Sequence, residues 1–369
     1  MFSNLSLSLD FGSGDYRIPA INVRYEDGTT VSPFVYRSHE ITSGKPSLDD
    51  AQPAFYVESS SEATTLRVEL SDPLTGLLVD LYYTIYEGTD VIIRRSVVRN
   101  TTPSVVHLLG LASASIDFAA SSLGYQLHSL SGSWARERHL TSRPLSLGTT
   151  SVESRRGASS HQHNPFVIVS DGPYSEDRGE HFAVGLVYSG GFQAQAEMAQ
   201  TGRVRLSMGL SSHNFDWVLQ ADQTFVSPEA VLVYSAHGAG HISRQMHKLI
   251  RTRLVKGAWR DRTRPILINS WEAMYFNVTE DKIVDLLAVP AAELGMDLVV
   301  LDDGWFGQRD DAKSSLVRNK SRTFHCLLTL ISLRVTGTPT RPSSRTASRA
   351  SPTAFLPSAS SLASGWSPR

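Results

Sequence analysis

Several features that often mark a protein's class are scarce or missing in this sequence of 369 residues. Cys326 is the only cysteine, which excludes an intrachain disulfide and a cysteine-ligated metal site. No stretch approaches the roughly 18–20 apolar residues that a membrane-spanning helix needs. The first residues do not combine a basic segment with an apolar one, so we expect no signal peptide. These absences leave the cellular compartment open.

The sequence also has no large excess of positive or negative charge, because its formal net charge is only −1. Without a basic surplus we expect neither a nucleic-acid partner nor a membrane surface. The balance is uneven along the chain, since residues 317–369 contain seven Arg, one Lys and no acidic residue. We expect an aberrant, disordered tail there, either translated in a shifted reading frame or a genuine low-complexity segment.

Residues 1–238 have the pattern of an all-β domain. Runs of β-branched and aromatic residues are separated by Gly, Pro, Asn and Asp, without helical segments between them. Many short strands of this kind predict a large antiparallel sandwich. We expect strands near residues 68–71, 77–86, 91–99, 105–111, 181–188, 192–198, 203–208 and 230–234, with turns at Gly28, Gly88 and Gly202.

Residues 239–264 are expected to connect this domain to the next one. Apolar Ile242, Met246 and Leu249 recur at helical spacing and predict a helix over residues 240–255. The other face of this helix is basic, which is typical of a solvated surface.

A β-α-β unit is predicted from Pro265 onward. The apolar runs Ile266–Ile268 and Leu298–Leu301 are typical of strands that are buried on both faces of a parallel sheet. Between them, apolar residues recur at helical spacing. Four residues are expected to cap, kink or end this helix, namely Asn277 or Thr279, Pro290 and Gly295.

A right-handed crossover brings the carboxyl ends of both strands to one edge of the sheet. We therefore expect Trp271 and Glu272 to lie near Asp302, Asp303 and Trp305. Ligands bind at this edge in parallel α/β folds, and carboxylates beside indole rings suit the hydroxyl groups and the apolar face of a sugar. The residues alone also permit a plainer interpretation, in which the acids are a solvated strand end and the aromatic residues belong to the core.

Long motifs in both regions resemble one enzyme family. They are Gly-Asp-Tyr-Arg-Ile-Pro-Ala at 14–20, Gly-Ser-Trp-Ala-Arg-Glu-Arg at 132–138, Ser-Arg-Arg-Gly-Ala-Ser-Ser-His-Gln-His-Asn-Pro-Phe at 154–166, Asn-Ser-Trp-Glu-Ala-Met-Tyr-Phe at 269–276 and Val-Val-Leu-Asp-Asp-Gly-Trp-Phe-Gly at 299–307. With shorter matches, they resemble the bacterial and fungal α-galactosidases (melibiases) of glycoside hydrolase family thirty-six. The resemblance covers nearly all of residues 10–316.

The resemblance implies a multidomain fold, β followed by α/β. Residues 1–238 are expected to form an antiparallel β-supersandwich whose first strands are missing. A catalytic (β/α)₈ barrel should follow, but such a barrel needs about 250 residues. The chain ends at residue 369, so we expect residues 265–316 to hold only the first β-α-β unit of an incomplete barrel, before the tail at 317–369.

Site residues are likewise implied by the resemblance. In the family, acids that match Asp302 and Asp303 bind galactose hydroxyls, and tryptophans that match Trp134 and Trp271 line the pocket. We expect these four to be the substrate-binding residues. The family's nucleophile lies in a Lys-Trp-Asp segment, which this sequence lacks, and its acid/base Asp follows a later strand. We therefore expect no catalytic residue in this chain.

No cofactor or metal is expected. His161 and His163 alternate in a polar loop, which is weak evidence for a metal site. We expect both histidines to satisfy hydrogen bonds in that loop instead.

The function implied by the resemblance is retaining hydrolysis of terminal α-galactosyl residues from oligosaccharides such as melibiose and raffinose. Family members often form homotetramers. Because the reacting carboxylates are missing, we expect the chain as given to be inactive. Two alternatives stay open: a non-catalytic galactose-binding remnant, and a galactosyltransferase relative that builds raffinose-type sugars. Galactose binding without turnover would favour the first, and transfer to sucrose would favour the second.

Overall fold

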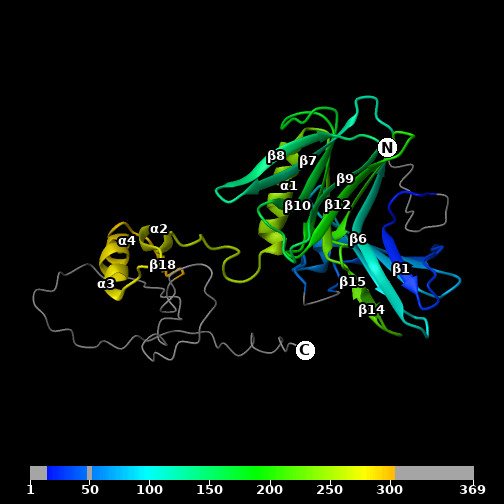
Figure 1. Cartoon of the computed structure of the whole chain (residues 1–369), viewed down its shortest axis with the longest axis horizontal. Helices are drawn as coiled ribbons and strands as arrows, with labels where there is room; N and C mark the ends of the chain where they lie inside the picture. Colours follow the sequence, from blue (N-terminus) through cyan, green and yellow to red (C-terminus); the bar gives the residue numbers. More distant parts are fainter. Residues whose placement is uncertain (1–14, 48–51, 304–369) are drawn as a thin grey trace, which may run out of the picture. The chain divides into compact units, whose positions relative to one another are not determined.

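A computed structural model describes residues 15–47 and 52–303 (Figure 1). The chain divides into two units, residues up to Arg262 and residues from Thr263. The predictions for Trp305 and for the tail at 317–369 lie outside the described residues. The domain boundaries expected at 238, 264 and 316 stay predictions.

Antiparallel strands build the first unit, as the sequence predicts. A five-stranded sheet has the order β1-β6-β13-β12, with β14 paired to β6, and a ten-stranded sheet has the order β2-β3-β4-β5-β16-β11-β10-β7-β8, with β15 paired to β5. A short 3₁₀ helix, η1, precedes β3. The bounds are β1 Ile21–Tyr25, β2 Val35–Ser43, η1 Ser60–Glu62, β3 Ala63–Ser71, β4 Leu78–Tyr86, β5 Val91–Arg99, β6 Val106–Phe118, β7 Tyr125–Ser133, β8 Arg136–Pro144, β9 Gly148–Ser154, β10 His163–Asp171, β11 His181–Val187, β12 Phe192–Met198, β13 Val204–Leu210, β14 Trp217–Leu219, β15 Thr224–Val226 and β16 Glu229–Ser235.

Alternation along β16 shows how the large sheet is buried on both faces. Ala230 packs between the two sheets, in a core that it shares with Phe192 of the small sheet. Its neighbour Val231 belongs to a second core, which contains Ile242 of helix α1, Ala239–Leu249. Since successive side chains of a strand point to opposite faces, the large sheet lies between the small sheet and α1.

The helix expected over residues 240–255 is observed. It consists of α1 and a π-helical turn, η2, at Ile250–Leu254. Ala239, Ile242 and Leu249 are its buried apolar residues, whereas Lys248 and Arg251 on the basic face are exposed. In the described ranges, no helix is both long and apolar enough to cross a membrane.

Four ions hold the start of the described chain on the small sheet. Arg205 of β13 is only 2% exposed and contacts Asp117 of β6 at 2.8 Å and Asp15 at 2.9 Å. Arg17 contacts the same two carboxylates, at 3.0 and 2.7 Å. The hydrogen bond from Arg17 holds the pKa of Asp15 far below its ordinary value, although burial opposes this shift. The Asp and Arg of the Gly-Asp-Tyr-Arg motif therefore have a structural role.

The second unit contains two parallel strands joined by helical turns. Strand β17 is Leu267–Asn269 and β18 is Leu298–Val300, and they pair with Leu267 opposite Leu298. This arrangement confirms the predicted β-α-β unit. Its helical elements are α2 Trp271–Met274, α3 Glu280–Lys282, the π-helical η3 Ile283–Ala288 and α4 Val289–Glu293.

The capping and breaking residues of this connection act as the sequence predicts. Thr279, not Asn277, is the N-cap, and its Oγ1 accepts from the backbone N–H three residues on. Pro290 lacks an N–H, and the α geometry gives way to a π-helical segment just before the turn that holds it. Gly295 ends the helix at φ 77°, and the next N–H donates to the carbonyl of Ala291, as in a Schellman motif.

The prediction that both strands are buried on both faces is wrong. Ile266 is 60% exposed and Leu267 is 48% exposed, and Leu286 of the helical connection is 63% exposed. The described residues of this unit supply two strands and one helical connection, which is too little to cover both faces of a sheet. Met274, Leu287 and Ala291 are the buried apolar residues of the connection.

Candidate functional site

The carboxyl ends of β17 and β18 meet at one edge of the parallel pair, as the crossover rule predicts. Asn269 lies opposite Val300 in the ladder, and Asp302 follows two residues later. The Nδ2 of Asn269 donates to Oδ2 of Asp302 at 2.8 Å. The register of the strands therefore places an amide beside a carboxylate at the edge where parallel sheets bind ligands.

Both carboxylate oxygens of Asp302 are held by neutral donors. Oδ2 accepts from Asn269, and Oδ1 accepts from the backbone N–H of Asp303 at 2.6 Å. The Oγ of Ser270, a fully buried residue, accepts from the N–H of Asp302 at 3.0 Å. Each carboxylate oxygen has a second lone pair, so a carboxylate fixed in this way can still accept from a ligand hydroxyl.

Asn269 also positions Trp271. Its Oδ1 accepts from the backbone N–H of Trp271 at 2.8 Å. The indole ring packs edge-on against two further rings, with centroids 5.3 Å from Tyr275 and 5.0 Å from Phe276. One side chain thus connects the predicted sugar-binding residues Trp271 and Asp302. No role was predicted for Asn269, although its position at the end of the first strand, before Ser-Trp, is the signal that identifies it.

The backbone beside this cluster is strained at Tyr275. Its φ is 48° and its ψ is −127°, a conformation that non-glycine residues rarely adopt. The N–H of Tyr275 donates to the carbonyl of Trp271 at 2.8 Å, and its hydroxyl donates to Glu272 at 3.3 Å. Such strain costs on the order of 1–3 kcal/mol and gathers at functional sites.

Trp134 lies at the tip of the β7–β8 hairpin in the first unit. Ser133 pairs with Arg136, so the loop is Trp134 and Ala135, and Ala135 has a φ of 58°. A Cβ on Gly132 would lie 2.2 Å from the carbonyl oxygen of Arg136, so the hairpin needs glycine there. Trp134 is 83% exposed, so it does not belong to the core of the first unit. Its expected role beside Asp302 and Asp303 stays a prediction.

The expectation that both loop histidines satisfy hydrogen bonds is wrong for His163. Its Nδ1 is buried and has no hydrogen-bond partner in the described part of the chain. The register of β10 with β7 shifts between His163 and Val167. His161 is exposed. Across 15–47 and 52–303, no three His, Cys, Asp or Glu side chains are grouped to hold a metal ion.

Comparison with family models divides the chain in two. Residues 5–220 match the model of the glycosyl hydrolase family 36 N-terminal domain, and residues 224–324 match the melibiase model. The first match includes the hairpin with Trp134, and the second includes the edge with Asn269 and Asp302.

Two similar proteins with curated names are alpha-galactosidases. Alpha-galactosidase AgaA of Geobacillus stearothermophilus is 48% identical over 306 residues, which are 83% of this chain and 41% of that relative. Probable alpha-galactosidase C of Aspergillus terreus is 42% identical over 300 residues, which are 81% of this chain and 40% of that relative. The chain thus spans about two-fifths of the length of these relatives.

Solved structures are similar over the same region. The crystal structure of AgaA has a TM-score of 0.79 at 48% identity, covering 83% of this chain and 42% of that one. Variants of AgaA were solved in complex with stachyose and with raffinose, each with a TM-score of 0.78, 48% identity and coverage of 82% of this chain and 41% of that one.

Proposed function

The chain belongs to glycosyl hydrolase family 36, and on that premise we propose that it serves an α-galactosidase-type reaction, the retaining hydrolysis of terminal α-D-galactosyl residues in oligosaccharides such as melibiose and raffinose. The names of its relatives and the stachyose and raffinose complexes of AgaA variants support this substrate class. The observation in this chain that carries the proposal is the Asn269–Asp302 hydrogen bond, beside Trp271, at the carboxyl edge of the parallel strands.

The proposal gives four residues a role in holding the sugar. Asp302 and Asp303 accept hydrogen bonds from galactose hydroxyls, since an ionised carboxylate is an acceptor with two oxygens and about four lone-pair sites. Trp271 and Trp134 cover the apolar face of the ring. Asn269 is a positioning residue, because its side chain fixes the carboxylate of Asp302 and the backbone of Trp271.

The residues from Pro265 to Asp303 are proposed as the first β-α-β unit of a (β/α)₈ barrel. The parallel register of β17 and β18 and the melibiase match support this placement. In such barrels the ligand-binding residues lie at the carboxyl ends of the strands, where Asn269 and Asp302 are found.

The chemistry of retaining hydrolysis needs a nucleophilic carboxylate and an acid/base carboxyl group about 5–5.5 Å apart on either side of the glycosidic bond. Asp302 and Asp303 are neighbours in sequence, and the N–H of one is bonded to the carboxylate of the other. They are proposed to hold substrate, and no residue of this sequence is assigned either reacting role, because it contains no Lys-Trp-Asp. The 369-residue chain is therefore proposed to bind galactose without hydrolysing galactosides.

Calorimetric titration of the purified chain tests this proposal. Galactose should bind, glucose should bind at least about tenfold more weakly because one hydroxyl is inverted, and p-nitrophenyl galactoside should not be hydrolysed. Asp303→Asn should weaken galactose binding by about tenfold or more, and the matched exposed control Asp285→Asn should not change it. Equal affinity for both sugars, or rapid turnover, would contradict the proposal.

A further inference from the structure

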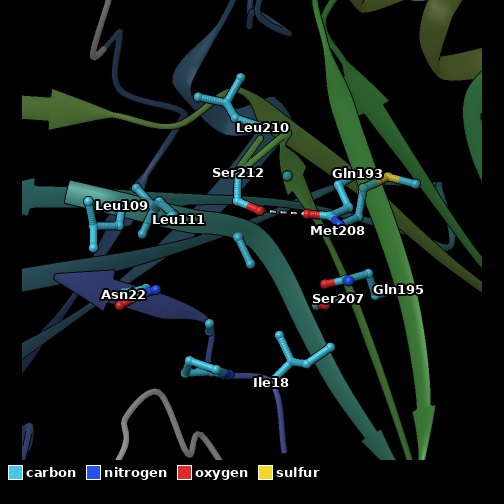
Figure 2. A pocket seen from close by; sticks show the side chains of 15 residues that line it. Ile18, Asn22, Leu109, Leu111, Gln193, Gln195, Ser207, Met208, Leu210 and Ser212 are labelled. Carbon is cyan, nitrogen blue, oxygen red and sulfur yellow. Dashed lines mark hydrogen bonds between the residues drawn. The ribbon is translucent and has the colours of Figure 1, made fainter. Parts of the chain in front are cut away.

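A cavity lined by both polar and apolar residues lies in the small sheet of the first unit, which contains β1, β6, β13 and β12 in that order (Figure 2). Its volume is about 110 Å³. Its polar lining consists of the side chains of Asn22, Gln193, Gln195, Ser207 and Ser212. None of the residues that line it carries a charge, and none is aromatic.

Two β-bulges in β6 create this cavity. The ladder between β1 and β6 shifts between Asn22 and Val23, which leaves Leu109 as the extra residue. The ladder between β13 and β6 shifts at Gly209, which leaves Ser113 as the extra residue. Bulges bend a strand, redirect side chains and occur often next to functional sites. The cavity is therefore built into the backbone of the sheet.

Glycine is required at position 209 of β13, beside the bulge in β6. A Cβ on Gly209 would lie 2.6 Å from the carbonyl oxygen of Leu111, so no larger residue fits there. Gly110 is different, because a Cβ there would lie 3.8 Å from the Cβ atoms of Asn22 and Ser212, which is an ordinary contact. Alanine at 110 therefore fits the fold and occupies part of the cavity.

The amide groups in the cavity are only partly used by the protein. Gln193 is fixed, because its Nε2 donates to Glu153 at 3.1 Å and its Oε1 accepts from Ser212 at 3.0 Å (Figure 2). The side-chain amides of Asn22 and Gln195 have no hydrogen-bond partner among residues 15–47 and 52–303. A primary amide both donates and accepts, which is the pairing that a hydroxyl group needs.

We propose that this cavity binds one edge of an uncharged polyhydroxyl compound, a sugar or a polyol. The absence of charged side chains in the lining disfavours anions and cations, since nothing there neutralises a desolvated charge. Three to four molecules of liquid water, at about 30 Å³ each, occupy the same volume as this cavity. The cavity therefore has room for part of a pyranose ring and not for the whole ring. With no aromatic ring to stack on, the affinity should be on the order of millimolar, and galactose and glucose should differ by less than about threefold.

Glucose is the probe that separates this cavity from the proposed galactose-binding edge at Asp302. The side-chain amide NMR signals of Asn22 and Gln195 are followed in the isotope-labelled 369-residue chain during a glucose titration. These signals should shift and saturate. Gly110→Ala should weaken the binding by about tenfold and Gln195→Ala by about fivefold, whereas Gln126→Ala on β7, outside the lining, should leave it unchanged.

Two results of these titrations would overturn the cavity proposal, and a third concerns the proposed function. Signals that do not saturate by about 100 mM glucose would mean that the cavity holds only water and would overturn the proposal. Saturation that is unchanged in both Gly110→Ala and Gln195→Ala would place the binding elsewhere and would also overturn it. Loss of galactose binding at the Asp302 edge in Asp302→Asn, with the glucose-induced shifts of Asn22 and Gln195 retained, concerns the proposed function alone and supports a cavity that binds sugar independently of that edge.

Discussion

The side-chain amide of Asn269 donates a hydrogen bond of 2.8 Å to the carboxylate of Asp302, across the two parallel strands of the second unit. The same side chain accepts the N–H of Trp271. A single residue at the end of the first strand thus fixes an acceptor on the second strand and an aromatic residue on its own chain segment. The proposed galactose-binding edge depends on this pairing.

Replacing Asn269 should weaken galactose binding without unfolding the chain. Asn269→Ala removes one neutral donor from Asp302 and the acceptor for Trp271. Hydrogen bonds to charged groups contribute about 1.5–3 kcal/mol, so galactose affinity should fall by roughly tenfold or more in calorimetric titration. The control variant Asn277→Ala removes the same kind of side-chain amide from an exposed position after helix α2, and it should retain wild-type affinity. A decrease of the same size in both variants would contradict the positioning role of Asn269.

Arg205 should be essential to the stability of the first unit. It is buried and contacts both Asp15 and Asp117. Arg205→Met leaves two carboxylates short of a partner, and breaking a buried ion pair in this way costs about 3–5 kcal/mol. Urea unfolding should show this loss, whereas Arg203→Met at an exposed position should change stability by less than about 0.5 kcal/mol. Similar midpoints for the two variants would contradict the structural role of the cluster.

His128 should make the first unit less stable at acidic pH. It is 1% exposed, its Nδ1 lies 2.8 Å from the hydroxyl of Ser142, and its Nε2 lies 2.7 Å from that of Ser170. Burial lowers the pKa of His128 to about 4. Because the unfolded chain binds this proton near pH 6.5 and the folded chain does not, stability should fall as the pH drops from about 6.5 to about 4, by about 3 kcal/mol in all.

Urea unfolding at several pH values checks this dependence. His128→Asn should remove most of the decrease between pH 6.5 and 4, whatever its effect on stability at pH 7.5. His139→Asn, at an exposed position on β8, should keep the wild-type slope. A wild-type slope in His128→Asn would assign the pH dependence to other groups.

The sequence predicts the fold best where side-chain patterns report burial directly. The strands at 78–86, 91–99, 181–187 and 192–198 agree within one residue with their predicted bounds, because their apolar runs and turn residues mark both ends. The strands that were missed are β1, β2, β7, β8, β9, β10, β14 and β15. In β2 and β8 nearly all residues are exposed and no alternation marks them, whereas β10 was missed although Val167–Val169 is a buried apolar run. The expected burial of Ile266 and Leu267 was wrong, because it depends on layers that local sequence does not contain.

The candidate site was predictable in part. The crossover rule predicts that the strand ends meet, so Trp271 and Asp302 are expected at one edge from the sequence, and Asn269 contacts both of them in the structure. Their role in binding a sugar stays a prediction. Asn269 was missed because its role depends on the register of β17 with β18, which sets the amide against the carboxylate and is not visible in either segment alone. The bulges that open the cavity beside Gly110 depend on register in the same way.

Calorimetric titration of galactose into the 369-residue chain and into Asp302→Asn tests the central claim most directly. Asparagine keeps the shape of the side chain but loses the charge and half of the acceptor capacity. We predict saturable binding to the wild-type chain and a loss of at least about tenfold in the variant, with no change in its unfolding midpoint beyond about 1 kcal/mol. Equal galactose affinity in the two proteins would contradict the claim that this edge of the parallel strands binds the sugar.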